Sequence, residues 1–122
     1  MKPAKGPFYK VLDPGRKPPY QGWYRWPLPG TATEPVKGRL VMCQNGYHIA
    51  TRKQLLDYWL SLGVKVWLAK PHGPVMTDGF KCVCRSATLV RQVGSWTSKK
   101  RAQWRRAGGK KSQWKIMRGG AS

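Results

Sequence analysis

The chain has 122 residues, which favours a single domain, and its 40% hydrophobic content suffices for one modest core. It carries 24 Lys and Arg against four Asp and Glu, a formal net charge of +20 at pH 7. No apolar run approaches the about 18 residues of a transmembrane helix, and MKPAKGPFYK has no signal-peptide core. Three cysteines without an export signal favour reduced thiols in a cytoplasm over a disulfide framework.

The first half of the chain alternates short apolar stretches with turns. Residues 1–7 are predicted to be a flexible basic arm, and Phe8–Leu12 (FYKVL) a short strand. DPGRKPP is predicted as a turn, and residues 20–30 (YQGWYRWPLPG) as an aromatic-anchored loop, because their prolines forbid a central strand. Arg39–Cys43 (RLVMC) is predicted as a strand that ends in the turn Gln44-Asn45-Gly46.

An amphipathic helix over about residues 52–62 is the clearest local signal. Thr51 and Gln54 stand at the spacing of a capping box, in which Thr is the N-cap and Gln the third helical residue. Apolar residues follow at helical spacing, and a glycine stands where a helix C-terminus favours one. These residues are Leu55, Leu56, Trp59 and Leu62, followed by Gly63.

The second half of the folded region is rich in β-forming residues. Val64–Lys70 alternates as a strand should, PHGPVMTDG is predicted as a turn-rich connection, and Phe80–Val93 as one long bent strand or two. A helix between short strands predicts a small α+β domain over residues 8–94, with a mainly antiparallel sheet.

The composition changes at Ser95. Residues 95–122 hold nine of the 24 Lys and Arg and no acid, and they form a predicted Lys/Arg/Trp-rich C-terminal arm. One helix, about Thr97 to Ala107, is predicted before Gly108-Gly109 breaks it. The arm is therefore expected to be partly helical.

Several short motifs occur in an order that resembles a family of small uncharacterised proteins of tailed phages and actinobacterial genomes. They are YQGWYRWPLPG, GRLVMCQNGYH, QLLDYWL, VKVWLAKPHG and KCVCRSATLVRQVGSW, spanning about Tyr20 to Trp96. Family members often carry a second cysteine two residues after the histidine, where this chain has Ala50, and they are usually less basic. The positions that match the family pattern are Trp26, Pro27, Cys43, Gly46, His48, Leu55, Trp59, Trp67, Leu89, Arg91 and Trp96. The resemblance implies a phage or prophage context, in the cytoplasm of the host cell or in a virion, and no established activity.

Cys43, His48, Cys82 and Cys84 are the candidates for a metal site, because thiolate and imidazole suit zinc. Their spacing is C-x4-H and C-x-C, whereas structural zinc sites pair ligands as C-x2–4-C. Two small core cysteines are the alternative for Cys82 and Cys84. We predict no bound metal and no cofactor.

Cys43 and His48 also allow a catalytic interpretation, with a thiolate nucleophile and its base. The Gly46-Tyr47-His48 order before a helix is faintly similar to the ADP-ribosyltransferase type of fold, in which His48 would position a sugar or nicotinamide hydroxyl. The chain has only four acids and no Gly-rich phosphate loop. The alternative is an imidazole that bonds the backbone of a corner, and we predict a non-enzymatic protein.

Nucleic acid is the predicted partner, because Lys and Arg neutralise phosphates and Trp can stack on bases. Trp59 and Trp67 are expected to fill the core instead, and Trp23 and Trp26 are open between the two roles. No helix-turn-helix or zinc-finger pattern is present, so we expect binding to the phosphate backbone, of DNA or RNA, without strong sequence specificity. The alternatives are an interaction or inhibitor protein on an acidic protein surface, and a virion component; no membrane is expected. The predicted binding residues are Lys99, Lys100, Arg101, Trp104, Arg105, Arg106, Lys110, Lys111, Trp114, Lys115 and Arg118.

Overall fold

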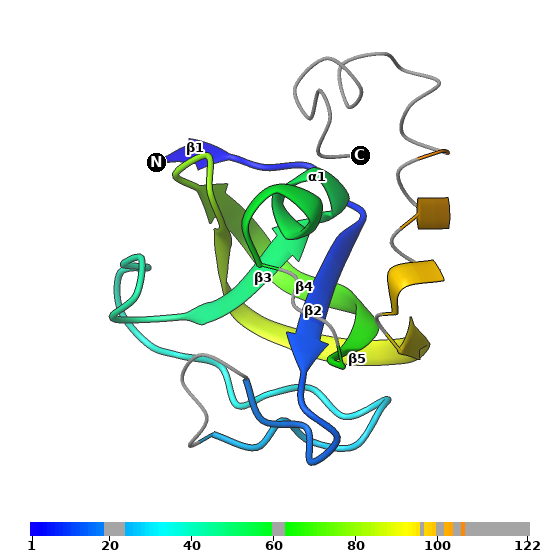
Figure 1. Cartoon of the computed structure of the whole chain (residues 1–122). Coiled ribbons are helices and arrows are strands. Elements are labelled where there is room, and N and C mark those ends of the chain that lie inside the picture. Colours follow the sequence, from blue (N-terminus) through cyan, green and yellow to red (C-terminus); the bar gives the residue numbers. More distant parts are fainter. Residues whose placement is uncertain (19–23, 60–62, 96, 100–101, 104–105, 107–122) are drawn as a thin grey trace.

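The described residues up to Ser95 fold into an antiparallel sheet of five strands with one short helical segment, an α+β arrangement (Figure 1). A computed structural model describes residues 1–18, 24–59, 63–95, 97–99, 102–103 and 106. The strands are β1 (Lys2–Pro3), β2 (Phe8–Leu12), β3 (Tyr47–Thr51), β4 (Lys65–Thr77) and β5 (Cys82–Ser95). The helical segment consists of α1 (Arg52–Gln54) and η1 (Leu55–Trp59).

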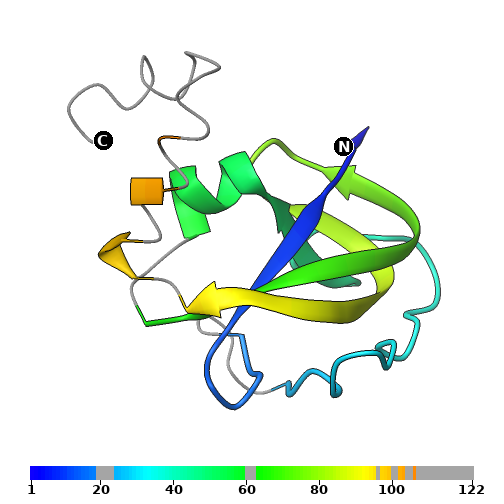
Figure 2. The same ribbon diagram turned by 90° about the vertical axis from the view of Figure 1, so that its right-hand side faces the viewer.

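Four of the strands close on themselves. The order is β1-β4-β2-β3-β5, and β4 also pairs with β5, so β4, β2, β3 and β5 form a ring of hydrogen-bonded strands that we call the barrel. Closure depends on the length of β4 and β5, which pair from Lys65↔Ser95 to Thr77↔Cys82 and curve along the way (Figure 2). Three register shifts in this pairing allow the curvature, since bulges bend a strand and increase its twist.

β2 has the bounds that its sequence predicts, and its alternating side chains contribute to two apolar clusters. Phe8 and Leu12 belong to the interior cluster of the barrel, and Val11 belongs to a second cluster with the helical segment. The interior cluster consists of Phe8, Leu12, Trp26, Ile49, Ala69, Val75, Cys82, Cys84, Ala87 and Leu89. The second consists of Val11, Ala50, Leu55, Leu56, Val64 and Val66. The sheet is therefore covered by apolar contacts on both of its faces.

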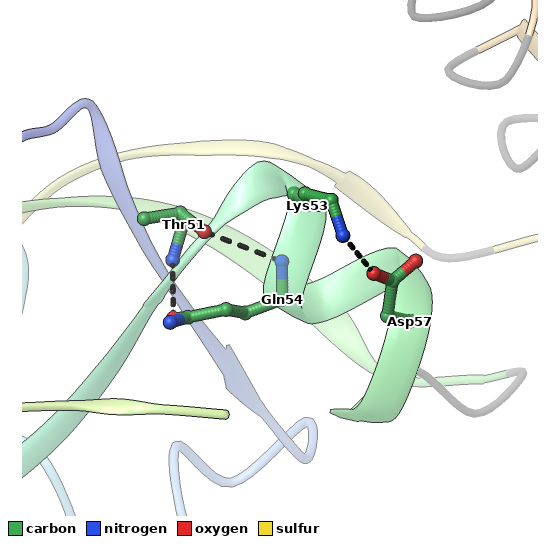
Figure 3. Close-up of polar contacts among 4 residues, drawn as sticks. All are labelled: Thr51, Lys53, Gln54 and Asp57. Carbon is green, nitrogen blue, oxygen red and sulfur yellow. Dashed lines mark hydrogen bonds and ion pairs between the residues drawn. The ribbon is translucent and has the colours of Figure 1, made fainter. Parts of the chain in front are cut away.

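The capping box at the start of the helical segment is confirmed (Figure 3). The backbone N–H of Gln54 donates to Oγ1 of Thr51 at 3.2 Å, and the backbone N–H of Thr51 donates to Oε1 of Gln54 at 3.1 Å. The predicted α-helix over 52–62 is wrong in form, because three α-helical residues give way to the wider π-helical segment Leu55–Trp59. Residues 60–62 lie outside the described residues, and Gly63 has a positive φ of 92°.

The predicted strand Arg39–Cys43 is wrong. Val41 and Asn45 form an isolated bridge, closed by the Val41 N–H to the Asn45 carbonyl at 2.9 Å, and β3 begins only at Tyr47. The amide of Asn45 donates to the carbonyls of Lys37 at 2.8 Å and Arg39 at 2.7 Å. These bonds occupy carbonyls that a strand would offer to a neighbour, which explains why the apolar run folds as a loop.

The predicted turn-rich connection PHGPVMTDG is also wrong over most of its length, because β4 continues to Thr77. Pro71 pairs with Ala87, and Pro74 lies in the register shift between His72 and Val75. Prolines are tolerated in strands at such irregularities, where no ladder donor is needed. The predicted β-region 80–93 proves to be one strand, Cys82–Ser95.

The N-terminal residues contain a short strand that the sequence does not predict. Lys2 and Pro3 form β1 and pair with Thr77 and Met76 of β4, where the sequence predicts no element. The predicted helix over about 97–107 is described only in part: Ser98, Lys99, Ala102, Gln103 and Arg106 are helical, and residues 100, 101, 104, 105 and 107 lie outside the described residues.

The loop before β3 covers the edge of β5 opposite β4, beyond the three residues that pair with β3. Trp26 enters the barrel interior from this loop and is 2% exposed, which makes the predicted aromatic anchor a core residue. Beyond it, three backbone N–H groups reach alternate carbonyls of β5, at 2.9 to 3.0 Å. These bonds join Gly30 to Leu89, Thr33 to Ala87, and Val36 to Arg85.

Candidate functional site

The Cys43–His48 corner is held by a hydrogen bond between a ring nitrogen and the main chain. The backbone N–H of Cys43 donates to Nε2 of His48 at 3.0 Å, and Cys43 itself has a positive φ of 65°. His48 lies in β3, opposite Val83 of β5, and is half-buried. The contact agrees with the interpretation of His48 as an imidazole that bonds the backbone of the corner.

The electrostatics of His48 argue against a role as a base for the thiol. Burial, and then the positive charges of Lys10 and Lys81, lower the pKa of His48 to about 4. The ring is therefore neutral at pH 7, and because Nε2 accepts a hydrogen bond, the proton resides on Nδ1. Removal of the Cys43 thiol proton by Nε2 would require the loss of the bond that shapes the corner.

The other two cysteines are buried side by side on β5. Cys82 and Cys84 belong to the interior cluster, in agreement with small core residues. Burial raises the pKa of the Cys84 thiol to about 12, and it also raises the pKa of Cys82. Both are therefore thiols at neutral pH, and the part of the chain that the structure describes brings no three His, Cys, Asp or Glu side chains together as metal ligands.

Lys10 is the residue at this site that the sequence reasoning missed. Its Nζ donates to the carbonyl of His48 at 2.7 Å and lies 5.1 Å from the centre of the Trp26 ring. Backbone pairing between β2 and β3 extends only over Phe8↔Thr51 and Tyr9↔Ala50. The lysine side chain therefore joins the two strands beyond the point where their ladder ends.

The position of Lys10 is unusual for a charged group. Burial lowers its pKa to about 8, against an opposing effect of Cys84. Roughly one-tenth of amines with this pKa are uncharged at pH 7, so Lys10 is mostly an ammonium ion. The groups that shift its pKa include no Asp or Glu that would pair with this charge. A signal existed in the sequence: Lys10 stands between Phe8 and Leu12 in a strand of period two, which directs it to the same face.

The Trp26 ring near this lysine belongs to an aromatic cluster. The ring centres of Tyr24 and Trp26 lie 5.7 Å and 5.6 Å from that of Tyr47, and the Tyr47 hydroxyl donates to the Glu34 carbonyl at 2.6 Å. Burial raises the pKa of Tyr24 to about 12. Trp67 packs against the interior cluster, as expected for a core residue. These rings fill the fold and tie down the loop before β3.

The basic residues of the described chain divide into two groups. Some bond within the fold: Arg16 donates to the Trp26 carbonyl at 3.1 Å, Arg85 to the Val36 carbonyl at 2.7 Å, and Lys65 to the Ser95 hydroxyl at 2.7 Å. The exposed group consists of Lys2, Lys5, Arg25, Lys37, Arg39, Lys53, Lys70, Arg91, Lys99 and Arg106.

Only two of the predicted binding residues lie in the described part of the chain, and both Lys99 and Arg106 are exposed. The others lie outside the described residues: Lys100, Arg101, Trp104, Arg105, Lys110, Lys111, Trp114, Lys115 and Arg118. Trp23 and Trp96 lie outside them as well. The exposed cations of the barrel and its loops are a basic surface that the sequence prediction, centred on the arm, did not include.

Comparisons of this chain with protein-family models, with curated proteins and with solved structures give no match. Within the described residues, no helix is long and apolar enough to cross a membrane.

Proposed function

We propose that this chain is a basic, non-enzymatic protein that binds the phosphate backbone of nucleic acid without strong sequence specificity. The supporting observation is the excess of cations on the folded part. Residues 1–94 contain fifteen Lys and Arg and all four acids, so even complete pairing would leave eleven cations in excess. Such a surface attracts a polyanion and gains affinity by counterion release.

The C-terminal arm adds to this surface in the proposal. It follows β5 directly, and Ser95, where the strand ends, is anchored by the Lys65 ammonium at 2.7 Å. Its nine Lys and Arg contact phosphates, and Trp104 and Trp114 stack on bases. The barrel places the arm, and the arm supplies much of the affinity.

The proposed setting follows from the resemblance to phage proteins. The protein acts in the cytoplasm of the host cell of a phage or prophage, within a larger complex or a virion. A non-enzymatic role is supported by the state of the Cys43–His48 corner, in which the ring nitrogen already accepts a backbone N–H.

The salt dependence of binding tests the proposal on the full chain. Glutamine at Lys99, Lys100, Arg101, Arg105 and Arg106 should flatten the slope of log affinity against log salt by up to about 4.5 for a duplex. A control with glutamine at Lys37 and Arg39 removes two exposed charges from the loop before β3. If DNA and RNA each bind the five-fold variant as tightly as they bind the wild type across the salt range, the arm has no role in binding.

Purification distinguishes the nucleic-acid partner from an acidic protein. The ultraviolet absorbance ratio of the purified protein should fall after nuclease treatment, because co-purified nucleic acid is removed. A complex with another protein that survives nuclease would favour binding to an acidic protein surface. Detection of this protein in purified phage particles would favour a virion component.

A further inference from the structure

Two aromatic side chains from separate elements meet on the surface of the protein. Tyr58 of η1 and Phe80 of the turn between β4 and β5 have ring centres 5.1 Å apart in an edge-to-face arrangement. Tyr58 is 50% exposed and Phe80 54% exposed. Large rings usually bury more area than this, so an exposed pair marks a surface that a partner can cover.

The elements that carry the two rings are fixed to each other by polar contacts of the Gln54 side chain. The Gln54 amide donates to Oγ1 of Thr77 at 3.1 Å, and the Cys82 thiol donates to Oε1 of the same glutamine at 3.2 Å. One side chain thus ties the start of the helical segment to both strands beside the turn. The Thr77 hydroxyl in turn donates to the Lys81 carbonyl at 2.7 Å.

The turn that carries Phe80 is itself closed by side-chain bonds. Oδ1 of Asp78 accepts the backbone N–H of Phe80 at 2.9 Å and that of Lys81 at 3.1 Å. The Gly79 N–H donates to the hydroxyl of Thr77 at 3.0 Å. The ring of Phe80 is therefore presented from a built turn, and a ring held in place loses little entropy when a ligand stacks on it.

The acids near the aromatic pair do not repel an anion strongly. The Asp57 side chain is 1% exposed, and its carboxylate is paired with the Lys53 ammonium at 2.6 Å. The Asp78 carboxylate is engaged by the two turn N–H groups. Lys81 follows Phe80 directly, on a chain of net charge +20, so the pair suits an aromatic ligand that carries negative charge.

We propose that Tyr58 and Phe80 are a stacking site for the unpaired bases of single-stranded nucleic acid. The inference rests on the proposed function and narrows it to single strands. Bases in a duplex are already stacked on one another, whereas those of a single strand present open faces to aromatic rings. The phosphates of the same strand are bound by the exposed cations, and the rings add contacts that do not depend on salt.

The test uses the full chain and fluorescence anisotropy with labelled oligomers of about 20 nucleotides, a length that covers the usual single-strand site sizes. The probes are oligo-dT, oligo-U, a mixed-sequence duplex and polyglutamate. Tyr58→Ala with Phe80→Ala should weaken single-strand binding about tenfold or more, which corresponds to the loss of one or two stacks. Duplex and polyglutamate binding should change less than about twofold, because phosphate and carboxylate contacts dominate them.

Tyr58→Phe is the matched control, because it keeps the ring and should bind as the wild type does. The single variants Tyr58→Ala and Phe80→Ala each give part of the loss, and they serve if the double variant unfolds. Unchanged single-strand binding in all of them, or an equal loss for duplex and polyglutamate, overturns the stacking site and leaves the proposed function standing. A wild type that binds neither single strand nor duplex at low salt overturns the proposed function itself. Comparison of oligo-dT with oligo-U separates DNA from RNA.

Discussion

The backbone N–H of Cys43 and the ring nitrogen Nε2 of His48 are joined by a hydrogen bond of 3.0 Å across the corner that leads into β3. The bond uses the main chain of the cysteine and leaves its thiol on the exposed side. The sequence suggests Cys43 and His48 as a nucleophile and its base, but the hydrogen bond between them involves the backbone of Cys43 and not its thiol.

Cys43→Asn should preserve the corner. Asparagine tolerates the positive φ of 65° better than most residues, and the donor is a backbone N–H that every residue except proline supplies. We expect the free energy of unfolding to change by less than about 0.5 kcal/mol, as for an exposed site without a special role. Cys43→Val should cost about 1 to 2 kcal/mol, because a β-branched side chain fits poorly at positive φ. Urea unfolding measures both. A binding or cellular effect lost with Cys43→Asn at unchanged stability would assign the thiol a chemical role.

The pH dependence of stability should report on His48. Its folded-state pKa of about 4 lies below its ordinary value of 6.5, so the unfolded chain binds a proton first as the pH falls. The stability associated with the neutral ring is complete above pH 6.5 and is lost as the pH falls from 6.5 towards 4. Between pH 7 and pH 5 the loss should be about 2 kcal/mol.

His48→Gln removes this loss while keeping an acceptor for the Cys43 N–H. Its unfolding free energy should therefore fall less than that of the wild type between pH 7 and pH 5. His72→Gln, a change at an exposed histidine of β4, is the control and should retain the wild-type loss. If the His48→Gln and wild-type curves run parallel, the imidazole is not held neutral by the fold.

The sequence predicted best where one local rule determines the structure. The bounds of β2 and the Thr51–Gln54 capping box follow from strand period and cap chemistry within a few residues. The strand predicted at Arg39–Cys43 failed because the amide of Asn45 captures carbonyls six and eight residues upstream. β4 continues through Pro71, which pairs with Ala87, and through Pro74, where β4 has one residue more than β5 in the register shift, and this partner strand is distant in sequence.

The candidate site shows the same division. Cys43 and His48 could be recognised from residue types and spacing, but the direction of their hydrogen bond depends on how the loop turns. The half-buried Lys10 side chain reaches the His48 carbonyl and the Trp26 ring because the ring of strands closes, and only the period of β2 indicated this position. The Tyr58–Phe80 pair joins residues from two elements that no local pattern relates.

Gly46 should be the glycine least tolerant of substitution in a set that shares a positive φ, which consists of Gly30, Gly38, Gly46, Gly63, Gly73 and Gly79. A Cβ added there would lie 2.4 Å from Cγ2 of Val83 and 3.1 Å from the carbonyl oxygen of Cys84, at a φ of 135°. Gly46→Ala should lower the free energy of unfolding by about 3 kcal/mol or more, through overpacking and backbone strain together. Gly30→Ala is the matched control, since its φ is 90° and nothing lies within 4 Å of the added Cβ. It should cost about 1 kcal/mol, from the left-handed conformation alone. Equal costs in urea unfolding would contradict the close approach of Gly46 to β5.

The free energy of unfolding should rise with pH in mild alkali, because the pKa of Lys10 is lower in the folded chain than in the unfolded chain. Its folded-state pKa of about 8 lies below the ordinary 10.5, so between these values the unfolded chain binds the proton and the folded chain does not. Stability therefore rises with pH through this window, by about 1 kcal/mol between pH 7.5 and pH 9. The comparison is with Lys10→Met, which lacks the titrating group and keeps the apolar stem.

The difference between the two unfolding curves isolates the lysine from thiols that titrate in the same range. Burial raises the pKa values of Cys82 and Cys84, which lowers stability as the unfolded chain loses its thiol protons. That contribution is common to both proteins and cancels in the difference. A difference that stays constant from pH 7.5 to pH 9 would show that the ammonium of Lys10 is well solvated.

Gln54 should be the most sensitive polar residue of the helical segment. It is 8% exposed and bonds to the Thr51 N–H, the Thr77 hydroxyl and the Cys82 thiol. Gln54→Ala should cost about 2 kcal/mol, because it removes half of the capping box and leaves buried groups without their partner. Thr51→Ser is the control at the other half of the box, and it should stay within about 0.5 kcal/mol because the hydroxyl remains. Loss of Gln54 should also loosen the turn that carries Phe80, so single-strand binding should weaken in Gln54→Ala and not in Thr51→Ser. If Gln54→Ala unfolds at the wild-type urea concentration, the glutamine does not join the helical segment to the β4–β5 turn.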